Sequence, residues 1–234
     1  MSEPNDRSPE AVLAASDGYQ FEISGGNLAL DFANTVSRRA DPADCREGLT
    51  NYGRLVSWGL QAGLIAPKDG ERLRATARRQ PRPAAAALRR AVALREAIFS
   101  LFVAIARDEH PPDEALDIVN AALPQALAAL RVLPRGDGFA WGFAQAETDL
   151  APMLAPVLRA AADLLTSPDL VRIRECGSDT CFWLFLDRSK NGSRRWCDMK
   201  VCGNRAKARR HYQRERKAAR PRRSARGHPR TSSE

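Results

Sequence analysis

The sequence has no long hydrophobic run, although 44% of its 234 residues are hydrophobic. A helix that crosses a membrane needs about 20 consecutive apolar residues. The best candidate, residues 97–106, is too short and is flanked by Arg95, Glu96 and Arg107. The first ten residues, MSEPNDRSPE, lack the basic start and apolar run of an export signal. We therefore expect a cytoplasmic protein with no membrane partner.

Histidine is scarce, with three residues in the whole chain. His110 is the one in the N-terminal part, which has no GxSxG, P-loop or HExxH pattern. His211 and His228 lie in a strongly basic region near the C-terminus. These absences argue against a catalytic site, so we do not expect an enzyme.

Cysteine is limited to five residues, and four of them form two pairs. Cys176 and Cys181 are separated by four residues, as are Cys197 and Cys202, and fifteen residues lie between the pairs. Two short Cys loops can offer four thiolates to one tetrahedral ion, so the spacing predicts one structural zinc. Two disulfides or four free thiols are the alternatives, and a catalytic zinc would need an open coordination position. Cys45 is expected to be a free thiol in a polar loop.

The residues around these cysteines predict a small fold built on the metal. The apolar run 181–186 has strand character, and polar residues 189–193 favour a turn after which 194–196 return toward the second Cys pair. Residues 204–219 are rich in helix-forming side chains. We expect a treble-clef-like finger, with Trp183 and Trp196 in a small core beside the zinc.

Helical periodicity dominates the rest of the chain. The strongest signal is 84–108, whose broad apolar face is interrupted at Arg95. Other helices are expected at 28–36, 50–63, 67–79, 113–130 (kinked or split at Pro124) and 147–166 (bent at Pro152 or Pro156). Residues 19–24 alternate like a short strand, and the Asp-Gly step at 137–138 favours a β-hairpin over 131–143.

The expected fold class is mainly α with short β elements. A disordered leader (1–18) precedes a helical domain with a β-hairpin (19–167), a treble-clef-like zinc finger (168–217) and a basic disordered tail (218–234). The hinge at Ser167 and Pro168 is short, so the two folded parts should pack together and could communicate.

Three polar residues, Asp31, Asn34 and Thr35, lie on or beside the expected helix that Asn27 caps. Such residues most often serve helix capping and surface polarity. A contact with a small-molecule effector is the alternative, which makes these three residues the candidate ligand site.

Positive charge is concentrated at the C-terminal end. From residue 171 onward there are 19 Lys and Arg against 6 Asp and Glu, whereas residues 1–170 carry 18 against 22. A cationic patch of this kind attracts polyanions, so we expect the finger to bind nucleic acid. The candidate contacts are Arg194, Arg195, Lys200, Asn204, Arg205, Lys207, Arg209, Arg210 and Arg214.

Two roles stay open for Asn204 and Arg205. At the start of the helix they can read base edges, because Arg pairs with guanine and Asn with adenine. Directly after a ligand Cys, they can instead hydrogen-bond the thiolates and orient them. Structured RNA is an alternative target to duplex DNA.

The segment SRRWCDMKVCGNRAKARRHYQR resembles the CGNR zinc finger, whose name is the tetrapeptide Cys202, Gly203, Asn204, Arg205. Upstream, GGNLALDFANT, LVSWGLQAGLI and LREAIFSLF resemble the ABATE domain that usually precedes this finger. The resemblance implies a bacterial, stress-related transcription regulator. It would bind DNA at the nucleoid through its finger and sense an effector, or form a homodimer, through the upstream domain.

Overall fold

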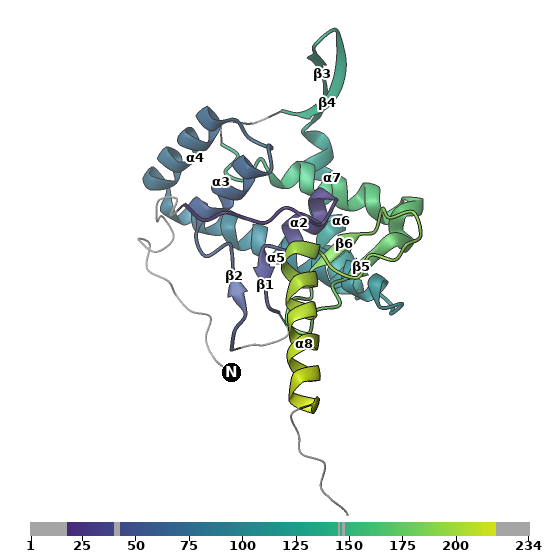
Figure 1. Ribbon diagram of the computed structural model, residues 1–234. Helices are drawn as coiled ribbons and strands as arrows, with labels where there is room; N and C mark the ends of the chain where they lie inside the picture. Colours follow the sequence, from purple (N-terminus) through teal and green to yellow (C-terminus); the bar gives the residue numbers. More distant parts are fainter. Residues whose placement is uncertain (1–17, 40–42, 145, 147, 219–234) are drawn as a thin grey trace, which may run out of the picture.

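The computed structural model describes residues 18–39, 43–144, 146 and 148–218, and it is mostly helical (Figure 1). The expected leader and tail lie outside these residues, except for Gly18 and Ala218. No helix in the described ranges has both the length and the apolar character needed to cross a membrane. The elements are α2 (Leu28–Ala33), β1 (Val36–Ser37), β2 (Arg46–Glu47), α3 (Tyr52–Gln61), α4 (Pro67–Arg79), α5 (Pro81–Ala106), α6 (Asp113–Ala128), β3 (Leu130–Arg135), β4 (Gly138–Phe143), α7 (Leu154–Leu165), η1 (Pro168–Arg172), β5 (Ile173–Glu175), β6 (Leu184–Leu186), η2 (Met199–Gly203) and α8 (Asn204–Ala218).

Helix α5 carries the main core. It begins at Pro81, earlier than the expected residue 84, because the missing N–H of a proline costs little at the first helical position. Helices α2, α3, α4 and α6 pack against it. Its apolar face is confirmed, and the buried residues on it include Ala84, Ala87, Ala91, Leu94, Ile98, Leu101 and Phe102. Removing this face from water is the main force that assembles the helices.

Arg95, which interrupts that face, is buried in an ion-pair network. Its guanidinium donates to the Glu47 carboxylate at 2.6 and 2.7 Å and contacts Glu96 at 2.7 Å. Arg39 donates to Glu96 at 2.7 and 3.1 Å. Burial alone would raise the pKa of Glu96, but its bonds to Arg39 and Arg95 lower that pKa overall. The buried charge is tolerated because it is paired on two sides.

Four local expectations differ from the structure. The helix expected at 28–36 ends at Ala33, and Val36 lies in β1. Helix α6 continues through Pro124 and is not split there. Helix α7 begins at Leu154, not near residue 147, and this start places Pro156 in the first turn, where its missing N–H is harmless. Residues 19–24 form no strand; the Gln61 side chain bonds this segment instead, accepting from the N–H of Phe21 and donating to the carbonyl of Tyr19.

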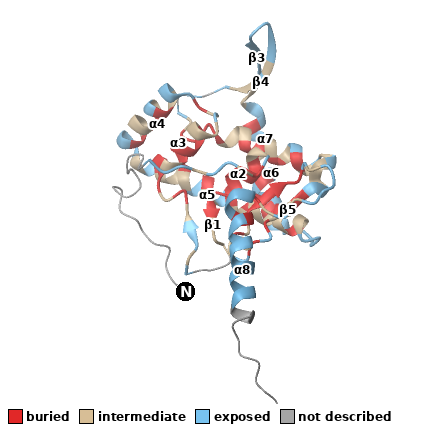
Figure 2. Cartoon of the chain, in the orientation of Figure 1, coloured by how far each residue is buried: buried red, intermediate tan, exposed pale blue. Residues whose placement is uncertain are grey.

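The predicted β-hairpin is present as β3 and β4, which pair antiparallel along their whole length. Gly136 has φ of 58°, which suits the first position of a two-residue hairpin turn. The hairpin projects beyond the helices (Figure 1), and most of its surface is exposed (Figure 2).

Strands β5 and β6 join the finger to the helical part. Ile173, Leu184 and Leu186 are at most 2% exposed and belong to the same hydrophobic cluster as α5. Residues 194–196, which follow the expected turn, form no strand; β6 pairs with β5 instead, and this pairing packs β6 against α2 and α5. The boundary at 167/168 stays a prediction, and the core is continuous across it.

Candidate metal centre and nucleic-acid interface

Four cysteine side chains converge at the base of α8. Cys176, Cys181, Cys197 and Cys202 are all buried, and their Sγ atoms lie within 4.8 Å of one another. The Sγ atom of Cys197 is 3.6 Å from those of both Cys181 and Cys202. Zn–S bonds of about 2.3 Å place tetrahedral sulfurs roughly 3.8 Å apart, so the four thiols fit one structural zinc.

Two tight turns hold the ligands. In the first, the N–H of Cys176 donates to the Trp183 carbonyl at 2.8 Å and that of Cys181 to Ser178 at 3.1 Å. In the second, the Asp198 side chain accepts from the N–H of Val201 at 2.9 Å and opens the π-helical turn η2, which leads directly into α8. The metal ligands therefore fix the start of the cationic helix.

The electrostatics of the four thiols also favour a cation. Hydrogen bonds from Cys181 and Cys197 hold the pKa of the Cys176 thiol well below its usual range, and the bond to Cys176 raises the pKa of both donors. Burial raises the pKa of Cys202. Four buried thiols in contact cannot all ionise without a cation between them, and a divalent ion would allow this.

A small aromatic core surrounds the sulfurs, as expected for the two tryptophans. Trp183 and Phe185 are buried with the cysteines, and Trp196 packs against them. The indole N–H of Trp183 donates to the Val36 carbonyl at 2.8 Å. This bond ties the metal centre to the segment that follows α2.

Asn34 forms a contact that the sequence gave no sign of. Its side-chain amide donates to the Leu184 carbonyl at 2.8 Å and accepts from the Leu184 N–H at 2.9 Å. The amide thus takes the place of a neighbouring strand for β6. No local pattern identifies this role, because the partner lies 150 residues away.

The other two candidate ligand contacts are also bonded within the protein. Asp31 accepts from the N–H of Gly25 at 2.7 Å, and burial raises the pKa of its carboxyl. The hydroxyl of Thr35 donates to the Phe32 carbonyl at 2.8 Å. The expectation that these polar side chains lie on the surface is wrong, since Asp31, Asn34 and Thr35 are at most 6% exposed. With Trp183 they line a cavity of about 100 Å³, and their ligand role stays a prediction.

Arg194 is bonded inside the protein. Its guanidinium donates to the Trp196 carbonyl at 2.9 Å and to the Ser24 carbonyl at 3.1 Å, and it contacts the Cys197 carbonyl. It also lies over the Phe185 ring, 4.4 Å from the centroid. These contacts clamp the finger to the segment before α2, so we do not retain Arg194 as a nucleic-acid contact.

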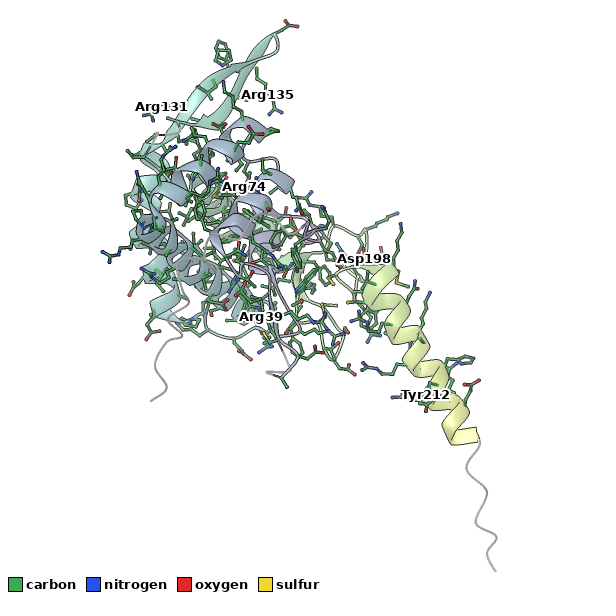
Figure 3. The ribbon with its side chains drawn as sticks, turned by 90° about the vertical axis from the view of Figure 1, so that its left-hand side faces the viewer. Arg39, Arg74, Arg131, Arg135, Asp198 and Tyr212 are labelled. Carbon is green, nitrogen blue, oxygen red and sulfur yellow. The ribbon has the colours of Figure 1, made fainter. Side chains whose placement is uncertain are left out.

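The other candidate nucleic-acid contacts lie on the surface. Helix α8 projects away from the body with its side chains in solvent (Figure 3). Asn204 and Arg205 are exposed, and among the described residues neither side chain hydrogen-bonds a cysteine. This geometry gives no support to a role in orienting the thiolates, and base reading stays a prediction. The further exposed candidates are Arg195, Lys200, Lys207, Arg209, Arg210 and Arg214.

A cleft of about 320 Å³ separates the first Cys turn from α8. Arg195, Arg205, Arg209 and Arg210 line it together with Asp179 and Trp196. Arg209 forms an ion pair with Asp179 across this cleft. Four guanidinium groups against one carboxylate give the cleft a net positive charge.

Two family models match the chain. The ABATE model, described as a putative stress-induced transcription regulator, matches residues 26–168. The model described as the CGNR zinc finger matches residues 172–215, which include all four cysteine ligands. No curated protein matches the chain.

Proposed function

The chain belongs to the ABATE family of putative stress-induced transcription regulators and ends in a CGNR zinc finger, and we propose that it is a zinc-dependent regulator that binds duplex DNA. In this proposal the exposed face of α8 enters the major groove. The other three arginines of the cleft at its base, Arg195, Arg209 and Arg210, hold the phosphate backbone, while Arg205 reads a base.

The observation that carries the proposal is the exposure of α8. Residues 204–214 of this 15-residue helix include five exposed basic residues, Arg205, Lys207, Arg209, Arg210 and Arg214. A helix with so little apolar surface gains little from packing, so its orientation depends on the metal turn before it. An α-helix of about 10–12 Å diameter fits the roughly 12 Å width of the major groove.

The helical part would carry the regulatory input, by sensing an effector or by forming a homodimer. Several bonds connect the helical part with the finger, among them those of Asn34 with Leu184, of Trp183 with Val36, and of the Leu186 N–H with the Gly25 carbonyl at 2.7 Å. A shift of α2 would therefore move the finger. The proposal assigns no catalytic reaction to the chain.

The test begins with selection of duplex sequences by the zinc-loaded protein, followed by binding measurements at several salt concentrations. We expect Arg205→Ala to weaken binding about 5- to 100-fold, as the loss of one base contact does, with zinc content unchanged. Arg89→Ala removes an exposed arginine of α5 and should bind like the wild type.

Two results would contradict the proposal. In the first, Arg205→Ala binds selected DNA as tightly as the Arg89→Ala control. In the second, structured RNA displaces the selected duplex at the same salt concentration, which would favour RNA as the target.

A further inference from the structure

The β3–β4 hairpin has one apolar face that the described chain leaves largely exposed. Residues directly opposite in the ladder share a face, which places Val132 beside Trp141 and Pro134 beside Phe139. Phe139 is 78% exposed, Trp141 63% and Val132 57%. On the opposite face Arg131 and Arg135 alternate with Leu133, and these two arginines are seen on the hairpin in Figure 3.

This exposure is unusual for a hairpin that projects alone into water. A two-stranded hairpin without a packed face is marginally stable. Arg159 of α7 lies over the Trp141 ring at 5.1 Å, and Trp141 is still mostly exposed. Phe139, near the turn, lies beyond this cover. The alternation of large apolar residues on one face therefore indicates a surface that a partner covers.

An apolar groove lies at the base of the same hairpin. It measures about 970 Å³ and runs between α5, α6 and α7. Its floor includes the buried Leu94, Leu150 and Leu158, and small side chains such as Ala121 and Ala122 line its wall. A groove lined by alanines leaves room for a large side chain from outside.

We propose that the partner is a second copy of this chain, and that the hairpin of each copy docks in the groove of the other. Each hairpin has six-residue strands and is about 20 Å long at 3.3 Å per residue. If two hairpins lie side by side and antiparallel, the tip of each reaches the base of the other, where the groove begins. A two-fold axis then pairs the same surfaces twice.

The area and charge of the two surfaces agree with this arrangement. Phe139 and Trp141 would together bury roughly 300 Å², at about 150–250 Å² for a complete aromatic side chain. The two aromatics thus supply under half of the ~800 Å² that one partner contributes to a stable interface, and the exposed Val132 of the hairpin and Ile118 of the groove wall add to this area. The tip carries Asp137, and the groove is lined by Arg90 and Arg131 against one acid, Asp149, so the net charge of the groove is opposite to that of the tip.

This inference rests on the part of the proposed function that gives the helical domain a dimerising role. Its test is sedimentation equilibrium of the full-length, zinc-loaded protein without DNA. We expect a dimer at micromolar concentration. Phe139→Ser should raise the dimer dissociation constant about 100-fold or more, because the two-fold symmetry removes two anchors. Arg135→Ser, near the same turn but on the opposite face, should leave the constant unchanged.

The groove is tested with Ala121→Arg, which places a charge in the apolar wall at an exposed helical position. This variant should also be monomeric. Mixed with Phe139→Ser, it should recover part of the dimer, because one intact hairpin then meets one intact groove. Circular dichroism of each variant should match that of the wild type, since both side chains are exposed.

Several outcomes would overturn the inference. If the wild-type chain stays monomeric at ~100 μM, a second copy does not cover the apolar face of the hairpin. Dimers that persist in Phe139→Ser or in Ala121→Arg show that the hairpin or the groove is not used. DNA binding is measured separately, and a monomeric Phe139→Ser that still binds a half-site leaves the proposed function intact. A wild-type dimer without DNA binding would instead contradict that function alone.

Discussion

Replacement of Asn34 by alanine should both destabilise the protein and loosen its finger. The Asn34 amide makes two hydrogen bonds, at 2.8 and 2.9 Å, with the backbone of Leu184, which is completely buried. Alanine would leave one buried N–H and one buried carbonyl without partners, at about 1–3 kcal/mol each. The backbone at Asn34, with φ of −79°, suits alanine without strain. We therefore expect a loss of about 2–5 kcal/mol in the free energy of unfolding.

Two measurements test this expectation. Denaturant unfolding gives the change in free energy, and zinc release to a chromogenic chelator reports on the finger. The matched control is Asn51→Ala, because Asn51 is a buried asparagine that caps α3 by accepting from the N–H of Arg54 at 2.9 Å. Loss of that cap should cost about 1 kcal/mol and leave zinc release at the wild-type rate.

The reasoning is refuted if Asn34→Ala is no less stable than Asn51→Ala and releases zinc no faster than the wild type. Such a result would mean that the Leu184 backbone finds other partners. The attachment of β6 would then depend on its apolar packing alone.

Three further perturbations have defined outcomes. Cys176→Ser should lose stoichiometric zinc in elemental analysis, because serine is a poor zinc ligand, whereas Cys45→Ser should keep it. Asp179→Asn should strengthen DNA binding a few-fold in anisotropy titrations, because it frees Arg209 of the cleft to bind phosphate. The control is Asp169→Asn, which removes another exposed acid. Equal DNA affinities of the two variants would contradict the prediction. The pKa of Glu96 is lowered on folding, so its contribution to stability is present above the unfolded pKa of about 4.3 and is lost as pH falls through the folded pKa. In Glu96→Gln the midpoint of denaturant unfolding should therefore fall less steeply at acid pH than in the wild type.

Features that depend on neighbours in the sequence could be predicted. The four zinc ligands follow from two short Cys loops, and each loop closes over a few residues. The hairpin was predicted from the Asp137-Gly138 step, one position after its two turn residues, Gly136 and Asp137, and helix α5 from the spacing of its apolar residues. In each case the backbone bonds and side-chain periodicity are set within a few residues, so local chemistry decides the outcome.

Features that join distant segments could not be predicted in this way. The strand character of 181–186 was predicted, but its partner was not: β6 pairs with β5, and this pairing buries Leu184 and Leu186 in the main core. An apolar run shows that a strand will be buried, but it does not show against which element.

The sequence by itself determined the metal ligands, the helical fold class and the concentration of positive charge at one end. Only the tertiary structure decided that Asn34 holds β6 and that Arg194 clamps the finger internally, through a carbonyl 170 residues away. Polar side chains form such bonds with whichever backbone groups folding buries beside them. Their partners therefore become known once the packing of the whole chain is known.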